Sequence, residues 1–166
     1  MLKKAILPLL LFFCVNVFAQ TLKTRNVILV TLDGLRWQEL FRGADEKILF
    51  DEKYITDKSV IKDFWDPDPL ARRKKLFPFI WKEVGIRGQL YGNRDLGNRM
   101  NSCNIHGFSY PGYSELLVGF VDNRIRSNKL LLNPNYTVLD FIGWQEGFLS
   151  KVAAFTTWDA FPSILR

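Results

Sequence analysis

The run NVILVTLDG at residues 26–34 decides the expected fold. Val27 to Val30 are consecutive large aliphatic side chains, a composition typical of a strand that is buried on both faces of a parallel sheet. The run ends abruptly at Asp33 and Gly34, where a polar turn begins. We therefore expect a buried strand with Asp33 at its carboxyl end, which is where ligands gather in open α/β sheets.

The rest of the chain alternates between helix-like and strand-like segments. Helical spacing covers residues 35–41, 77–84, 111–121 and 137–145, and further strand candidates cover residues 88–91 and 151–157. Residues 44–75 are charged and irregular, which suggests a surface insertion or lid. The predicted fold class is α/β, with a mainly parallel sheet and flanking helices.

Residues 1–19 have the composition of a secretory signal peptide. Lys3 and Lys4 precede an apolar run, and Val17 and Ala19 provide a small-residue cleavage pattern. The run is shorter than the roughly 20 apolar residues that a membrane-spanning helix needs. We expect cleavage after Ala19, export to the periplasm or the exterior, and no stable membrane anchor.

Charge and cysteine content limit the remaining possibilities. Cleavage would remove two of the 23 basic residues and none of the 17 acidic ones, leaving a net charge of +4. This charge is too mild to argue for nucleic acid as a partner, and the densest basic run, residues 72–75, is expected to be a solvated face. Only Cys103 would remain after cleavage, so no intramolecular disulfide can form.

A second motif, FSYPGYSELLVG at residues 108–119, places Ser109 just before a predicted helix. The first N–H groups of a helix have no partner inside it, and together with the helix dipole they attract anions. Gly112 would let a bound group approach the backbone closely. The alternative is that Ser109 only caps the helix, and Asp33 has the same alternative as a cap.

Together the two motifs resemble the alkaline phosphatase superfamily, especially its nucleotide pyrophosphatase and phosphodiesterase branch. In the first segment, the residues that match are Asp33, Gly34, Trp37, Glu39, Phe41, Gly43, Ala44 and Asp45. In the second segment, the family has a nucleophile followed by an aromatic residue, a proline and, ten residues after the nucleophile, a glycine. The residues with this spacing are Ser109, Tyr110, Pro111 and Gly119. Ser127 and Asn128 are a looser match.

The resemblance implies a metal-dependent hydrolase of small-molecule phosphate mono- or diesters that forms a covalent phosphoserine. It implies Ser109 as the nucleophile and two divalent metal ions, usually zinc, with Asp33 and Ser109 among their ligands. The branch has an asparagine three residues after the nucleophile, where this chain has Gly112. Substrate contacts are therefore expected at Gly112 and from Asn104 or Asn101 in the preceding loop.

The metal ligands in that family are aspartates and histidines, most of them in the carboxyl-terminal half, whereas this chain has a single histidine, His106. We expect residues 20–166 to be the amino-terminal part of an alkaline phosphatase-like catalytic domain, a fragment that is inactive alone. A phosphomutase or sulfatase-like enzyme of the same superfamily and a non-catalytic exported binding protein remain alternatives. The ester class and the oligomeric state stay open.

Overall fold

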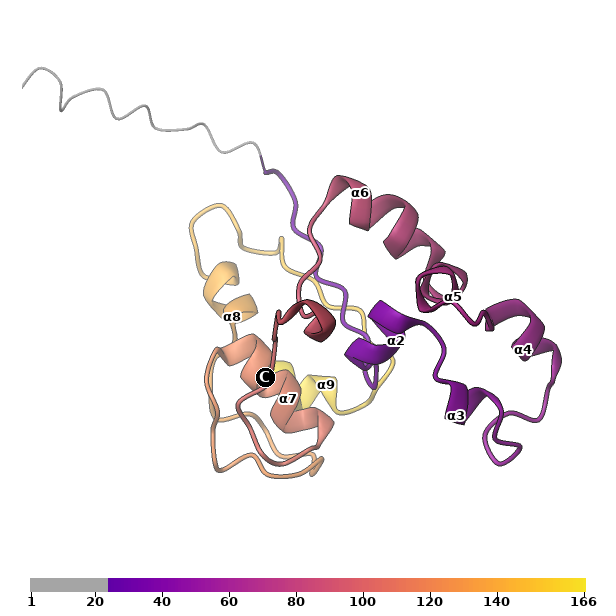
Figure 1. Cartoon of the computed structure of the whole chain (residues 1–166). Coiled ribbons are helices and arrows are strands. Elements are labelled where there is room, and N and C mark those ends of the chain that lie inside the picture. Colours follow the sequence, from indigo (N-terminus) through magenta and orange to yellow (C-terminus); the bar gives the residue numbers. More distant parts are fainter. Residues whose placement is uncertain (1–23) are drawn as a thin grey trace, which may run out of the picture. The chain divides into compact units, whose positions relative to one another are not determined.

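The computed structural model describes residues 24–166, and the signal peptide predicted over residues 1–19 lies outside them. The chain divides into two units at Leu32 and Asp33. The described part of the first unit, residues 24–32, is a trace without helix or strand (Figure 1). The second unit, Asp33–Arg166, holds the helices of the described chain.

The helices are α2 (Trp37–Arg42), α3 (Glu46–Leu49), α4 (Ser59–Phe64), α5 (Pro69–Leu76), η1 (Ile80–Val84), α6 (Gly85–Arg87), η2 (Arg94–Leu96), α7 (Ser109–Val118), α8 (Val138–Gly143) and α9 (Phe161–Leu165). The four helices expected from the sequence are confirmed as α2, as η1 with α6, as α7 and as α8. The helix α9 was not predicted.

The predicted α/β fold with a mainly parallel sheet is wrong, because residues 24–166 contain helices and loops but no β-strand (Figure 1). The segments expected as strands, residues 26–32, 88–91 and 151–157, do not pair in a hydrogen-bonded ladder. Strand formation requires such a neighbour, and a β-rich composition favours pairing without supplying it. Two of the segments are also weak strand formers, since 88–91 begins with glycine and 151–157 contains adjacent alanines.

The charged segment 44–75, expected as an irregular insertion, contains the three helices α3, α4 and α5. An aspartate lies one or two residues before each of these helices, and its side chain accepts from a backbone N–H in the first turn. The pairs are Asp45 with Lys47 (3.0 Å), Asp57 with Ser59 (2.9 Å) and Asp68 with Leu70 (3.0 Å). Pro69 occupies the first position of α5, where its missing N–H costs nothing. Asp45, Asp57, Asp68 and Pro69, which belong to the charged and proline-containing stretch that suggested a loop, therefore mark the helix starts.

The carboxyl end of α2 is capped by side chains from distant parts of the chain. A helix leaves its last four carbonyl groups without partners inside it, and all four have donors here. The bonds are Gly43 N to Glu39 O (3.1 Å), Trp81 Nε1 to Leu40 O (3.0 Å), Arg73 Nη1 to Phe41 O (3.3 Å) and Arg72 Nε to Arg42 O (3.1 Å). Two of the donors are cationic, which also suits the negative end of the helix dipole.

Gly43 allows α2 and α5 to approach each other this closely. Its φ of 81° lies in the left-handed region, and a Cβ there would sit 2.5 Å from both Arg72 C and Arg73 N. Any side chain at this position would therefore push the two helices apart.

The basic run 72–75, expected as a solvated face, is exposed at Lys74 and Lys75, whereas Arg72 and Arg73 are half-buried and make intramolecular contacts. Arg72 lies 4.4 Å from the ring centre of Trp65, and Arg73 lies 3.5 Å from that of Trp81. The ammonium group of Lys75 is 3.1 Å from Asp66. The expectation is corrected for Arg72 and Arg73, because aromatic faces and helix carbonyls, which the local sequence does not reveal, attract these two cations.

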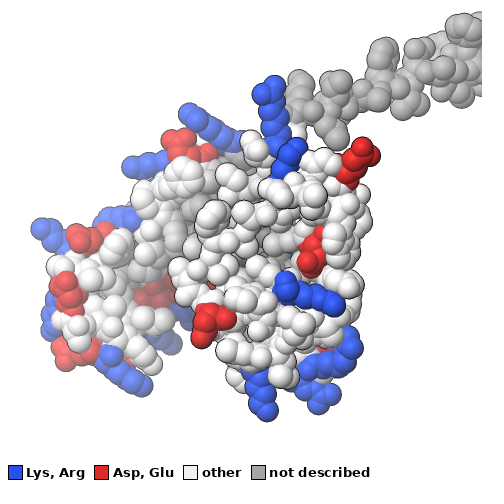
Figure 2. Space-filling model, turned by 180° about the vertical axis from the view of Figure 1, so that it is seen from behind, with Lys and Arg blue, Asp and Glu red and all other residues white. Residues whose placement is uncertain are grey.

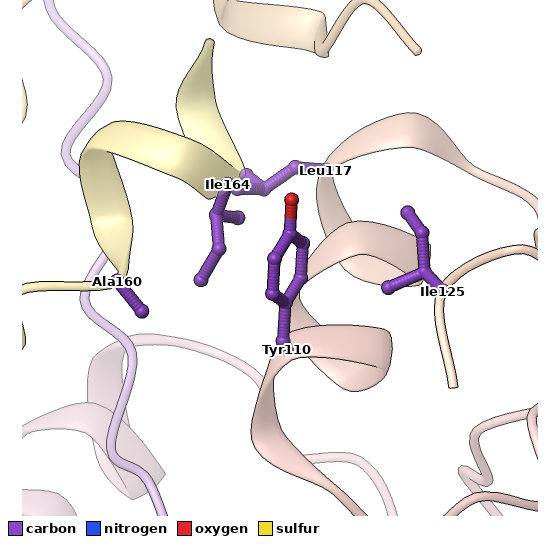
Figure 3. Close-up of a cluster of buried hydrophobic side chains, with 5 residues drawn as sticks. All are labelled: Tyr110, Leu117, Ile125, Ala160 and Ile164. Atoms are coloured by element: carbon purple, nitrogen blue, oxygen red, sulfur yellow. The ribbon is translucent and has the colours of Figure 1, made fainter. Parts of the chain in front are cut away.

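The carboxyl-terminal half has its own apolar core between α7 and α9. Its buried members are Tyr110, Leu117, Ile125, Ala160 and Ile164. Figure 3 shows side chains from α7 facing those from the start and body of α9, with the tyrosine ring in the middle. The tyrosine hydroxyl lies 2.5 Å from Leu131 O and 3.0 Å from Ser163 O.

A buried asparagine ties the same helices together through polar contacts. Asn133 is fully buried, and its side-chain nitrogen lies 3.2 Å from Ser114 Oγ on α7 and 3.1 Å from Ile164 O on α9. Its backbone N–H donates to Ser163 O at 2.8 Å. Because a buried amide must find partners, these bonds select one arrangement of the two helices.

On the surface, basic and acidic side chains are interspersed, and Figure 2 shows them around a broad uncharged area of the face that it draws. Several large apolar side chains are nearly fully exposed, among them Ile105 and Phe155. Within residues 24–166, no helix combines the length and apolarity needed to cross a bilayer.

Candidate nucleophile site at the start of helix α7

Ser109 is the first residue of α7, and Phe108 occupies the capping position before it. Phe108 has an extended backbone (φ −113°, ψ 152°), and no side chain caps the helix start. The alternative that Ser109 is only a helix cap therefore does not describe this structure. The serine is half-buried, and no group within residues 24–166 hydrogen-bonds its hydroxyl.

The first turn of α7 offers fewer free N–H groups than the sequence suggested. The Tyr110 N–H donates to Asn128 Oδ1 at 3.0 Å, Pro111 has no N–H, and Gly112 N–H donates to Phe108 O at 3.3 Å. Among the described residues, this leaves the N–H of Ser109 as the first-turn donor without a partner. The turn contains no acidic residue, so the positive end of the helix dipole is not offset locally.

Glu115 fixes the loop that precedes the helix. Its carboxylate accepts from Cys103 N at 2.5 Å, from Asn104 N at 3.1 Å and from Asn104 Nδ2 at 2.6 Å. The backbone hydrogen bond from Cys103 and the bonds from Asn104 lower the pKa of Glu115, although partial burial opposes them. Glu115 therefore holds residues 103 and 104 of this loop against α7.

Asn104, expected as a substrate contact, is already engaged within the protein. Its side-chain nitrogen binds Glu115, and its Oδ1 accepts from His106 N at 3.2 Å. One N–H of the amide remains for a ligand. Gly112, the other expected contact, faces open space, since a Cβ built there meets nothing within 4 Å. The space beside Gly112 would therefore also accommodate a side chain at this position.

The other two serines near the site differ from Ser109 in environment. Ser114 is 2% exposed, and its hydroxyl accepts from Asn133 Nδ2 in the core. Ser102 lies in an exposed loop and not at a helix start. Of the three, only Ser109 combines partial exposure, a hydroxyl without a partner and a position in the first turn of a ten-residue helix.

His106, the single histidine of the chain, is half-buried. Its Nε2 is shielded from solvent and has no hydrogen-bond partner among the described residues. A shielded ring nitrogen without a partner carries a desolvation cost. His106 therefore belongs to the loop beside α7 and not to a freely hydrated surface.

Asp33 lies in an exposed turn, and among the hydrogen bonds of residues 24–166 none joins it to Ser109. A dinuclear zinc site needs several carboxylate and imidazole ligands close together. Residues 24–166 contain no group of three or more His, Cys, Asp or Glu side chains placed to hold a metal ion. The residues described here therefore do not fit a metal pair by themselves.

Two contributors to this site were not identified as such from the sequence. Glu115 lies in the second motif, and a carboxylate on a helix that follows a polar loop can accept hydrogen bonds from loop N–H groups. Asn128 lies outside this motif, and its bond to Tyr110 spans 18 residues. Local patterns do not reveal a contact at that separation.

Comparison of the chain with protein-family models, with curated proteins and with solved structures finds no match in any of the three.

Proposed function

We propose that this chain carries the nucleophile of an exported hydrolase of phosphate esters, with Ser109 as the attacking residue. The proposal is supported by the resemblance of the two motifs to the alkaline phosphatase superfamily and by the environment of Ser109. A small-molecule phosphate mono- or diester is the proposed substrate. Nucleic acid is not a proposed partner.

The observation that carries the proposal is the hydrogen bonding and the position of the Ser109 hydroxyl. Among residues 24–166 neither this hydroxyl nor the backbone N–H of Ser109 has a hydrogen-bond partner, and both lie at the positive end of a ten-residue helix. A developing negative charge on a bound phosphoryl group is favoured at such a position.

In the proposed reaction, Ser109 Oγ bonds to phosphorus while the bond from phosphorus to the ester oxygen breaks. The serine proton leaves with the departing alcohol. Water then cleaves the Ser109–phosphorus ester, which restores the serine hydroxyl and releases phosphate from a monoester or a phosphate monoester from a diester. Asn104 is proposed to act mainly by holding the loop in place, with one amide N–H free to contact the substrate. Gly112 is proposed to leave room for the phosphoryl group.

The two divalent metal ions expected from the resemblance remain a proposal for the complete enzyme, with Asp33 as one ligand. Since the described residues assemble no three-ligand group, we expect the 166-residue chain to hydrolyse p-nitrophenyl phosphate no faster than zinc-containing buffer. Robust turnover by the purified chain that a chelator abolishes would show that its ligands had been misjudged. In the complete enzyme, Asp33→Asn should lower bound metal and turnover together, and unchanged values of both would remove Asp33 from the site.

Replacement of Ser109 in the complete gene product, translated to its own stop codon and loaded with zinc, tests the nucleophile. Ser109→Ala should abolish the covalent intermediate and reduce turnover by roughly a thousandfold or more, because both half-reactions pass through that oxygen. Ser102→Ala is the matched control and should retain most of the activity. Peptide mapping of enzyme trapped at low pH that places phosphate on Ser102 or Ser114 would end the assignment.

A non-catalytic exported binding protein is the second candidate, and the lack of a three-ligand group within residues 24–166 favours it. Total metal content of the complete gene product separates the two functions. A binding protein need hold no metal, whereas the hydrolase should hold two ions per chain.

A further inference from the structure

Residues 25–33 form a short segment with apolar side chains and a backbone without partners in the described part of the chain. Val27 is 85% exposed, Ile28 86% and Val30 74%. No backbone N–H or C=O of residues 24–32 hydrogen-bonds another described residue. A β-rich segment with unpaired backbone groups is a template for pairing with another strand.

The charges that flank this segment select its partner. Arg25 and Asp33 enclose seven residues without a charge, and they stand at equal distances from Leu29. When two copies pair in antiparallel fashion with Leu29 opposite Leu29, Arg25 of each copy faces Asp33 of the other. A parallel in-register pair would instead place arginine beside arginine and aspartate beside aspartate.

We propose that residues 25–33 are a self-association site, at which two copies of this chain pair as antiparallel strands centred on Leu29. The same register places Ile28 opposite Val30 and Val27 opposite Thr31, and such β-branched pairs stabilise antiparallel strands. A shift by one or two residues would separate both ion pairs. The site does not involve Ser109, but it shares Asp33 with the proposed metal site, so association is measured without metal.

Pairing of this kind should be weak and dependent on concentration. A ribbon of only two strands is marginally stable in water, and each copy keeps a second edge that is free to pair again. We therefore expect a monomer at low concentration that forms dimers and larger species as the concentration rises.

Charge exchange at the two ends tests the pairing in the full chain, with EDTA present because Asp33 is a proposed metal ligand. Arg25→Asp alone or Asp33→Arg alone converts both attractive pairs into repulsive ones and should weaken association on the order of tenfold. The double variant restores opposite charges and should associate like the wild type. Analytical ultracentrifugation over a concentration series measures each dissociation constant.

Cysteine pairs test the register, in a full-length background with Cys14→Ser and Cys103→Ser. In the proposed register, Val27→Cys of one copy and Thr31→Cys of another lie directly opposite, about 4.5–5.5 Å apart between Cα atoms, within disulfide range. Two copies of Val27→Cys would lie four residues apart along the strands, about 13 Å. Oxidation of the mixed variants should therefore give 27–31 disulfides, and each variant alone should give few.

Three results would overturn the proposal. One is a chain that stays monomeric at every concentration tested. Pairing of residues 25–33 within their own chain would give this result. Another is preferential 27–27 and 31–31 crosslinking, which indicates a parallel pair. The third is association that neither single charge variant weakens, which would place the contact elsewhere, for example in the apolar residues of the first 19.

Discussion

Replacing Tyr110 by phenylalanine isolates the contribution of one buried hydroxyl to the stability of the α7–α9 core. Tyr110 is 1% exposed, and its hydroxyl reaches Leu131 O at 2.5 Å and Ser163 O at 3.0 Å. Ser163 O also accepts from Asn133 N, so it keeps a donor when the hydroxyl is removed. Leu131 O loses the donor that the tyrosine provides.

The expected cost follows from these contacts. A buried hydrogen bond contributes about 1 kcal/mol net, and a carbonyl that loses its donor adds part of a desolvation penalty, so Tyr110→Phe should lower the free energy of unfolding by about 1–2 kcal/mol. With a urea dependence of about 2 kcal/mol per molar, the unfolding midpoint should fall by roughly 0.5–1 M. Equilibrium urea unfolding followed by circular dichroism measures this shift.

Tyr113 on the same helix provides the matched control. Its ring packs edge-on against Phe161 with centroids 4.8 Å apart, and no hydrogen bond to its hydroxyl occurs within residues 24–166. Tyr113→Phe removes the same atom and should change the free energy of unfolding by less than about 0.5 kcal/mol. A cost for Tyr113→Phe equal to or above that for Tyr110→Phe would refute the reasoning, as would a Tyr110→Phe midpoint equal to the wild type.

Two further predictions concern stability. Gly43→Ala should lower the free energy of unfolding by about 2–4 kcal/mol, because the added Cβ would meet the α5 backbone at 2.5 Å. Gly112→Ala places a Cβ in open space on a helix and should be neutral or raise the free energy of unfolding by up to about 1 kcal/mol. Thermal unfolding of the two variants measures both changes, and equal effects would contradict the packing argument. Glu115→Gln should cost about 1 kcal/mol at pH 7. The folded-state pKa of Glu115 lies below its ordinary 4.5, so the stability that its carboxylate contributes is present above pH 4.5 and is lost as the pH falls through the folded-state pKa. Urea midpoints measured from pH 7 to pH 3 should therefore decline less in Glu115→Gln than in the wild type. Parallel declines would exclude a stabilising role for the Glu115 carboxylate.

The sequence predicted those helices that carry their own boundary signals. α2 ends at Gly43 as expected, and α8 begins with a capping box in which Thr137 and Asp140 satisfy each other's backbone groups. The Asp68 and Pro69 pair carried an equally clear start signal for α5, but the density of charge and proline around it favoured a loop.

The strands and the site details depended on contacts that local sequence does not encode. The run at 26–32 has strand composition, but a ladder requires a second segment in register, and none pairs with it among the described residues. Ser109 was correctly placed at the start of a helix. The engagement of Asn104 by Glu115, and of the Tyr110 N–H by Asn128, spans 11 and 18 residues and was not predictable from the motif.

The capping of α2 has a consequence for the order in which the chain acquires structure. A helix of six residues is too short to persist alone in water, and three of its four final carbonyl groups are satisfied by side chains 30 to 41 residues further along. During synthesis, these carbonyls must stay hydrated until Arg72, Arg73 and Trp81 have emerged from the ribosome. We therefore expect α2 to be a late element of folding, formed together with α5 and η1 although it precedes both in the chain.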